Sequence, residues 1–289
     1  MRIVLICRTY PTLRKGGMGH LCQDRAVELA KQGHDVHVFT TGGPDVIESD
    51  RLTIHHLRCK PCEYTDEFAH ECSDLVSILS PDVVHMDSFD SARPWWIGIK
   101  PPVSVTMNGF SFGAFLSAWN VTRVDGGEVP VTFNWQGMYR EREILAKAHR
   151  VIGVSEHEAW ILRDPFGLPN VSMIRNPIAR CFFDQPTVPP PARRVFCCAA
   201  VVSSGYRRFR VARKIAKELE SVCHIAEDLD REAMPGFYDR ASALVCPNLY
   251  AQGSDLTIDE SLSRGRPVIA WATGSMYWDD RKGIIKVPP

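Results

Sequence analysis

The 289-residue sequence has no apolar run near the length of about 18 residues that spans a bilayer. Its first apolar stretch, residues 3–7, is too short for the core of a signal peptide, and no small-residue cleavage site follows it. Net charge is lacking as well, because 34 Lys and Arg residues balance 34 Asp and Glu residues. These absences argue against a membrane-spanning or secreted protein and favour a cytoplasmic location. They also argue against an overall positive electrostatic field that would attract nucleic acid.

Neither a disulfide framework nor a metal site is expected. Ten cysteines are scattered among predicted strands and helices, which fits buried reduced thiols in a chain of this length. Cys59 and Cys62 form a CxxC pair that is followed by His70 and Cys72, so a zinc site is an alternative. The second pair has a single intervening residue and no similar cluster recurs, and we therefore predict no metal.

The first 40 residues have the pattern of a parallel α/β fold. A strand at 3–7 is followed by a glycine-containing turn at 15–20, an amphipathic helix and a second strand at 36–39. This order is a βαβ unit, which predicts a parallel sheet with a right-handed crossover. The turn lacks a GxGxxG fingerprint, so it either lets the backbone approach a ligand or is purely structural.

Polar residues follow two further predicted strands, at 82–86 and 103–109. Ligands collect at the carboxyl ends of strands in open α/β sheets, so we expect His85, Asp87 and Asn108 to face a cleft. A purely structural role for the histidine is the alternative.

Prolines mark the predicted domain boundary. A helix is predicted at 156–163 with Ser155 as its N-cap, and Pro-rich sequence follows it. The length suits two domains of about 100–200 residues each. We therefore predict an N-terminal domain at 1–178, a linker at 179–192 and a short C-terminal domain at 193–289.

Two segments of the second domain suit phosphate binding. Six basic residues and no acidic one lie at 203–217, after a predicted strand at 195–202. Residues 251–274 combine a polar turn, an amphipathic helix that stops at Gly265 and an apolar strand. The free amides and the positive dipole end of a helix N-terminus attract an anion. The alternatives are a solvated basic face and a purely structural helix–strand corner.

Together these segments resemble a GT-B glycosyltransferase of the family 4-like (group 1) kind. The likeness is carried by MRIVLICRTYPTLRKGGMGHL, AHRVIGVSEHEAWIL, FYDRASALVCPNLYAQGSDLTIDESLSRGRPVIA and KGIIKVPP. The resemblance implies two Rossmann-like α/β domains facing a cleft, with the donor nucleotide against the second domain and the acceptor over the first. It also implies sugar transfer from a nucleotide-diphosphate sugar to a hydroxyl acceptor, with retention and with no obligatory metal or other cofactor.

The resemblance also assigns residues. The family's Glu-x7-Glu motif falls on Gln252 and Glu260. Glu260 is expected to bind the donor ribose hydroxyls, and Gln252 to contact the sugar without the negative charge of the family's first glutamate. Asn108 stands where many relatives have His. The groups expected at the donor phosphates are the loop residues Gly16 and Gly17, the basic pair Arg208 and Lys214 (with Arg207 and Arg210 as alternatives), and the turn Gly253, Ser254, Asp255 and Leu256.

The resemblance leaves several partners and two alternative functions open. The acceptor is open between a small molecule, a glycan, a lipid-linked and a protein hydroxyl, and a membrane surface or another protein is a further candidate partner. Gln252, Asn108 and a chain end at Pro289, where relatives continue with more helices, make a non-catalytic nucleotide- or sugar-binding relative the alternative function. A transferase acting on modified nucleic acid is a third alternative, which the zero net charge disfavours.

Overall fold

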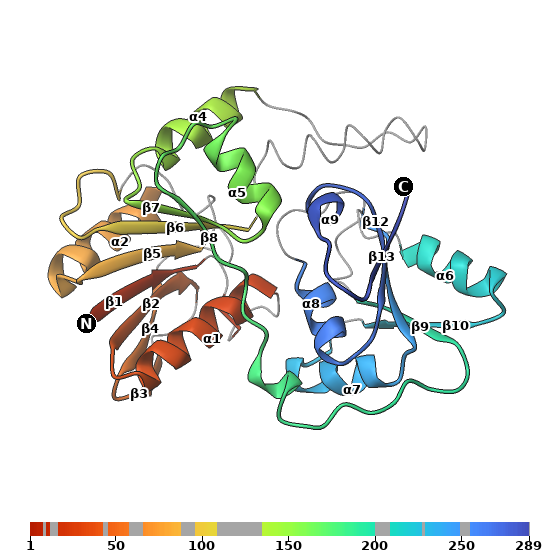
Figure 1. The fold of residues 1–289 in the computed structure, drawn as a ribbon. Coiled ribbons are helices and arrows are strands. Elements are labelled where there is room, and N and C mark those ends of the chain that lie inside the picture. Colours follow the sequence, from red (N-terminus) through yellow and green to blue (C-terminus); the bar gives the residue numbers. More distant parts are fainter. Residues whose placement is uncertain are drawn as a thin grey trace. The chain divides into compact units, whose positions relative to one another are not determined.

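The computed structural model describes residues 1–7, 10–11, 17–42, 46–57, 66–87, 96–108, 135–199, 209–226, 229–248 and 255–288. These residues form two compact units, each built on its own sheet (Figure 1). The first unit takes in the described residues of 1–110, 134–154 and 158–175, and the second those of 155–157 and 176–289. The domain limits predicted from the prolines remain a prediction.

An eight-stranded sheet forms the first unit, in the order β3-β4-β2-β1-β5-β6-β7-β8. Neighbouring strands are parallel except β3 and β4, which are antiparallel. The strand order turns back at β1, which pairs with both β2 and β5, as in Rossmann-like folds. The strands are β1 (Arg2–Ile6), β2 (Asp35–Thr41), β3 (Val46–Ser49), β4 (Leu52–Leu57), β5 (Val83–Asp87), β6 (Val103–Met107), β7 (Arg150–Gly153) and β8 (Val171–Met173).

Helices cover this sheet and close its core. They are α1 (Gly17–Lys31), α2 (Asp66–Leu79), α4 (Trp135–Leu145) and α5 (Glu156–Arg163). Helix α1 packs against β2 and β4, and its Cys22 and Ala26 are buried with Leu5 of β1 and Val38 of β2. The βαβ unit expected at the N-terminus is therefore confirmed as β1–α1–β2. The helix expected at 156–163 is α5, which leaves Ser155 at the predicted N-cap position.

The second unit has a five-stranded, all-parallel sheet in the order β10-β9-β11-β12-β13. Its strand order turns back at β9, which has β10 on one side and β11 on the other. The strands are β9 (Val195–Ala199), β10 (Val222–Ala226), β11 (Ala243–Cys246), β12 (Val268–Trp271) and β13 (Ile284–Val287). The helices are α6 (Phe209–Glu218), α7 (Met234–Asp239), α8 (Leu256–Ser263) and α9 (Ser275–Trp278), with 3₁₀ turns η3 (Arg180–Phe182) and η5 (Arg231–Ala233).

Both faces of this sheet are buried. Phe196 and Cys198 of β9 pack on one face with Ala212 and Ala216 of α6. The alternate residues, Cys197 and Ala199, join the core on the other face, to which α7 and α8 contribute. Because side chains alternate along a strand, burial on both faces requires an uninterrupted apolar sequence, which is what β9 shows.

Gly153, at the end of β7, lies against the backbone of α5. A Cβ at this position would come within 2.7 Å of the Ala159 nitrogen and 3.0 Å of its Cα. Since α5 would have to move off the sheet to make room, we expect Gly153→Ala to lower the free energy of unfolding by about 1–3 kcal/mol. Urea unfolding of the full chain measures the change.

The control for Gly153→Ala is Gly236→Ala. Gly236 lies within α7, and nothing lies within 4 Å of the added Cβ. Alanine is the better helix former by about 1 kcal/mol, so this variant is expected to be neutral or more stable. Equal losses of stability in the two variants would contradict the proposed steric conflict at Gly153.

Candidate functional site

Helix α8 is the element around which the candidate site is built. The helix and the strand predicted within 251–274 are confirmed as α8 and β12. Gly265 has a φ of +68°, a left-handed conformation that favours glycine, and it is the helix stop that the sequence predicted. Strand β11 precedes α8 in the chain, and the first turn of α8 begins at Leu256.

Asp255 is the N-cap of α8. Its Oδ1 accepts hydrogen bonds from the Thr257 backbone nitrogen at 3.2 Å and the Thr257 hydroxyl at 2.8 Å. Its Oδ2 accepts a hydrogen bond from Asn248, just beyond β11. The carboxylate thus fixes the start of the helix, and any contact of Asp255 with a phosphate would use its backbone amide.

Glu260 lies one turn further along α8 and is 9% exposed. The hydroxyl of Tyr238, on α7, donates a hydrogen bond to Glu260 Oε2 at 2.9 Å. Within the part of the chain that the structure describes, no donor reaches the second oxygen, Oε1. One oxygen of this carboxylate is therefore fixed by the protein, and the other is available to a ligand that offers hydroxyl groups.

The environment of Glu260 raises its pKa to about 7, mainly because the side chain is buried. The hydrogen bond from Tyr238 and the charge of Arg231 in η5 act in the opposite direction, whereas Asp255 and Asp259 raise the pKa further. Asp259 is itself paired with Arg281. The ionised form of Glu260, which accepts hydrogen bonds most strongly, is therefore gained as the pH rises through about 7.

Arg264, at the end of α8, is fully buried. Its Nε donates to Asp239 Oδ1 at 3.0 Å, and its Nη2 pairs with Oδ2 of the same carboxylate. The same guanidinium donates to three backbone carbonyls of the predicted linker: Phe182 at 3.0 Å, Gln185 at 2.8 Å and Pro186 at 3.0 Å. Arg264 thus ties the linker segment to α7 and α8.

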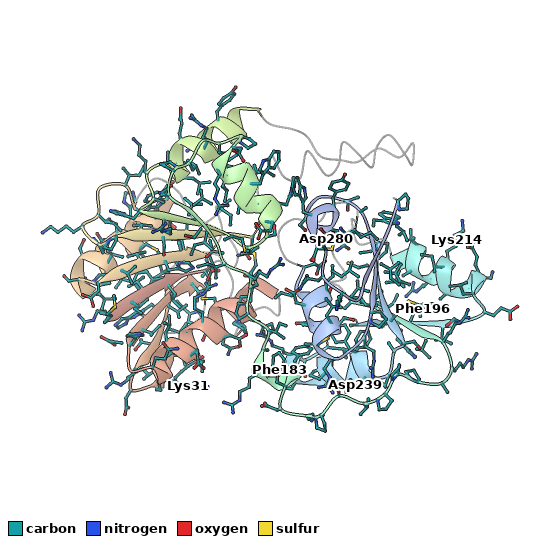
Figure 2. The ribbon with its side chains drawn as sticks, in the orientation of Figure 1. Lys31, Phe183, Phe196, Lys214, Asp239 and Asp280 are labelled. Carbon is teal, nitrogen blue, oxygen red and sulfur yellow. The ribbon has the colours of Figure 1, made fainter. Side chains whose placement is uncertain are left out.

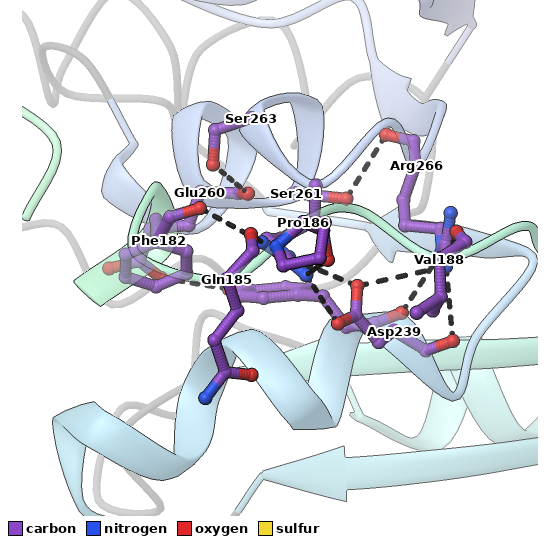
Figure 3. Close-up of polar contacts among 11 residues, drawn as sticks. Phe182, Gln185, Pro186, Val188, Asp239, Glu260, Ser261, Ser263 and Arg266 are labelled. Carbon is purple, nitrogen blue, oxygen red and sulfur yellow. Dashed lines mark hydrogen bonds and ion pairs between the residues drawn. The ribbon is translucent and has the colours of Figure 1, made fainter. Parts of the chain in front are cut away.

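Arg266 extends this arrangement towards β12 (Figure 3). It is 1% exposed and donates to the backbone carbonyl of Val188 at 2.8 Å and to that of Tyr238 at 3.2 Å. The sequence Arg-Gly-Arg-Pro predicted a helix stop, but not that both of its arginines are buried and bind backbone carbonyls. Arginines beside a glycine at the end of an amphipathic helix are equally typical of a solvated helix end, so the local sequence contained no signal for this role.

The predicted basic pair is only partly described. Lys214 lies in the middle of α6 with a side chain that is 79% exposed, and its Nζ is 3.9 Å from Glu218 Oε1 (Figure 2). Arg208 lies outside the described residues, as do its alternative Arg207 and the predicted donor-site residues Gly16, Gln252, Gly253 and Ser254. Of the predicted donor-site residues in 251–274, the structure describes Asp255, Leu256 and Glu260. Asp255 is the N-cap of α8, and the other two lie on the helix.

In the first unit, Gly17 is the first residue of α1 and Asn108 directly follows β6. His85 and Asp87 lie at the carboxyl end of β5, as expected, but Arg25 of α1 lies against both. Burial alone would raise the pKa of Asp87, but the charge of Arg25 and the hydrogen bonds from His85 and Arg25 lower it to about 2. Asp87, with a side chain 2% exposed, is thus held in a buried ion pair.

Another buried carboxyl, that of Glu158, was not predicted. Glu158, in the first turn of α5, is 1% exposed and accepts a hydrogen bond from the Val154 nitrogen at 3.0 Å. Burial raises its pKa to about 8. The capping-box spacing of Ser155 and Glu158 predicts a bond to the Ser155 nitrogen, so the contact with the Val154 nitrogen, one residue earlier, is not the one that the spacing indicates.

The described ranges of the chain contain neither a metal-binding cluster nor a membrane-spanning helix. These ranges contain no group of three or more His, Cys, Asp or Glu side chains that could hold a metal ion. Cys59 and Cys62 of the zinc alternative lie outside them. No helix within the same ranges is long and apolar enough to cross a membrane. Six of the eight cysteines that the structure describes are buried.

Comparison with solved structures supports the GT-B fold. Sucrose-phosphate synthase from Thermosynechococcus elongatus is 17% identical, with a TM-score of 0.78 over 100% of this chain and 86% of that one. Anabaena HepE in complex with UDP and glucose is 10% identical, with a TM-score of 0.73 over 100% and 86%. The starch synthase IV catalytic domain from Arabidopsis thaliana, bound to ADP and acarbose, is 12% identical, with a TM-score of 0.66 over 99% and 88%.

Comparison at the level of sequence identifies the family. No curated protein matches the chain. The family profile of Glycosyltransferase Family 4 matches residues 15–180, which is more than half of the 289 residues. The matched segment includes α1 and the strands β2 to β8. With two Rossmann-like units of the GT-B type and this match, the chain belongs to Glycosyltransferase Family 4.

Proposed function

We propose that this glycosyltransferase moves a sugar from a nucleoside-diphosphate sugar to a hydroxyl acceptor, with retention of anomeric configuration. The donor nucleotide binds to the second unit, where Glu260 receives the hydroxyl groups of its ribose. The location is proposed to be the cytoplasm, and the acceptor is a small molecule, glycan, lipid-linked or protein hydroxyl.

The observation that carries this proposal is the state of the Glu260 carboxylate. It is buried, its Oε2 accepts a hydrogen bond from Tyr238, and no described residue donates a hydrogen bond to Oε1. A vicinal pair of ribose hydroxyls supplies the donors that such a carboxylate needs once it is ionised. HepE and starch synthase IV, two structures of similar fold, contain UDP and ADP respectively, so either base is a candidate for this chain.

The proposed mechanism is electrostatic. Negative charge develops on the diphosphate as the bond from the anomeric carbon to the phosphate oxygen breaks, and preorganised positive groups stabilise it. These groups are proposed to be Arg208, Lys214, the backbone amides of Gly253 to Leu256, and the backbone at Gly16 and Gly17. Gln252 and Asn108 would hydrogen-bond the sugar.

The acceptor completes the reaction. Its hydroxyl oxygen forms the new bond to the anomeric carbon on the face that the diphosphate leaves, and its proton passes to the departing phosphate oxygen. No dedicated protein base and no obligatory metal enters this proposal.

Calorimetric titration of the full chain with UDP, ADP, GDP and TDP tests the donor site, and incubation with the corresponding nucleotide sugars tests catalysis. Binding together with release of the nucleoside diphosphate supports the transferase. Binding without turnover of any nucleotide sugar favours a non-catalytic relative instead. This is the specific rival because Gln252 has an amide where the family's motif has a carboxylate. No binding of any of the four nucleotides would contradict the proposed donor site.

The pH dependence of nucleotide binding provides a further prediction. Because the pKa of Glu260 is about 7, the ionised form falls as the pH is lowered from 8 to 6. We expect the affinity contributed by this carboxylate to fall by roughly tenfold over that range. Calorimetry at each pH with the nucleoside diphosphate that binds best measures the effect.

Glu260→Gln is the matched control for this titration, since the amide keeps the shape of the side chain and does not ionise. The nucleotide's own phosphate titrates equally in both proteins, so the difference between them isolates the carboxylate. Parallel pH profiles for the wild type and Glu260→Gln would rule out Glu260 as the titrating group.

A further inference from the structure

Tyr238 is a fully buried residue whose hydroxyl contacts the candidate donor site. It lies near the end of α7, within the core cluster that α8 and the sheet share. Its ring packs against Phe237 at a centroid distance of 5.5 Å and Phe182 at 6.1 Å. Its backbone carbonyl accepts a hydrogen bond from Arg266 at 3.2 Å. The phenol ring is therefore held from several sides, with its hydroxyl directed at Glu260.

The hydrogen bond between Tyr238 and Glu260 makes the two oxygens of the carboxylate unequal. Oε2 accepts from the Tyr238 hydroxyl at 2.9 Å, and no described residue donates to Oε1. The backbone of Glu260 is fixed as well, because its carbonyl accepts from the Arg264 nitrogen at 3.2 Å and the Ser263 hydroxyl at 2.7 Å. A glutamate has three side-chain torsions, so without the phenol its carboxylate could rotate among several rotamers.

We infer that Tyr238 is a positioning residue for nucleotide recognition: its hydroxyl holds Glu260 in the rotamer that presents Oε1 to the two ribose hydroxyls of the donor. This inference rests on the proposed function, in which Glu260 binds the ribose. It adds that the preference for a ribonucleotide depends on a residue that does not touch the ligand.

The charges around Glu260 allow the effect of Tyr238 to be separated from a loss of packing. The groups that act on the carboxylate are Tyr238 from α7, Arg231 from η5, and Asp255 and Asp259 at the start of α8. Tyr238 stabilises the ionised form through its hydrogen bond. Removing only the hydroxyl should therefore raise the pKa of Glu260, whereas a general loosening of the core would admit water and lower it.

The test uses the full chain with Tyr238→Phe, Glu260→Gln and the double variant. Calorimetry with UDP, ADP and GDP identifies the tightest ribonucleotide, which is then compared with its 2′,3′-dideoxy form from pH 6 to 9. We expect Tyr238→Phe to weaken ribonucleotide binding by roughly tenfold and dideoxynucleotide binding by less than about twofold. The pH midpoint should rise by about one unit. The double variant should bind no more weakly than Glu260→Gln alone.

The control is Tyr139→Phe, which removes the hydroxyl of a tyrosine that is 59% exposed in the first unit. It should bind both nucleotides as the wild type does. If Tyr238→Phe does not fold, Glu260→Asp replaces it. The shorter side chain keeps its charge but cannot reach both Tyr238 and the ribose, so ribonucleotide affinity should again fall by roughly tenfold.

The outcomes separate this inference from the function on which it rests. Wild-type affinity in Glu260→Gln would overturn the ribose assignment, and the inference with it. Loss of binding in Glu260→Gln combined with wild-type affinity and pH midpoint in Tyr238→Phe would overturn the inference alone. So would equal weakening of the ribo- and dideoxynucleotide, because it would indicate a structural role only.

Discussion

Replacement of Glu260 by alanine is expected to reduce the affinity for the best-binding nucleoside diphosphate by at least about a hundredfold. The ionised carboxylate is proposed to accept two hydroxyl donors, and each hydrogen bond to a charged group is worth about 1.5–3 kcal/mol. Alanine removes both bonds and also leaves the buried Tyr238 hydroxyl without its acceptor. Calorimetric titration of the full chain measures the loss.

Glu67→Ala is the matched control for this experiment, because Glu67 is an exposed glutamate in the first turn of α2. It removes the same carboxylate from the other unit and should leave nucleotide affinity unchanged. Unchanged affinity in Glu260→Ala as well would remove Glu260 from the donor site.

Replacement of Arg264 by leucine is expected to destabilise the second unit by about 3–5 kcal/mol, the usual effect of removing one partner of a buried ion pair. Asp239, with a side chain 14% exposed, would keep only the longer 3.7 Å contact with Arg266. Three linker carbonyls, those of Phe182, Gln185 and Pro186, would also lose their donor. Urea unfolding, followed by a probe in each unit so that the transitions are resolved separately, measures the change.

The control is Arg180→Leu in η3, which removes another arginine from an ion pair with an aspartate. Arg180 lies 3.4 Å from Asp184, but its side chain is 86% exposed. Exposed pairs of this kind contribute about 0–1 kcal/mol, so the unfolding midpoint should hardly move. If Arg264→Leu shifted the midpoint no more than Arg180→Leu, the buried clamp would not be what stabilises this segment.

Much of the fold could be predicted because it depends on short-range patterns. The apolar run at β9 and the helix limits of α5 are visible in local sequence, and so is the glycine stop at Gly265. The hairpin of β3 and β4 was not predicted. Strand β3 is largely exposed and carries a register shift between Ile47 and Ser49, so its sequence shows little of the apolar–polar alternation by which a strand is predicted.

The site was predictable only in part, because its contacts join residues far apart in the sequence. The position of Glu260 came from the family's motif, but its partner Tyr238 lies 22 residues away on another helix. Arg264 reaches carbonyls about 80 residues upstream, and nothing in its own neighbourhood distinguishes it from a solvated helix end. At β5, the sequence placed Asp87 at a strand end, but it could not show that Arg25 would neutralise it.

The most direct test is donor turnover by the full chain. Wild type and Glu260→Ala are incubated with UDP-, ADP-, GDP- and TDP-sugars, with water as the acceptor hydroxyl, and the released nucleoside diphosphate and the anomeric proton of the freed sugar are followed by NMR before mutarotation. We predict release from at least one donor by the wild type, loss of that release in Glu260→Ala, and an anomeric configuration that matches the donor. Nucleotide binding without release from any donor, or equal release by both proteins, would contradict the proposed function.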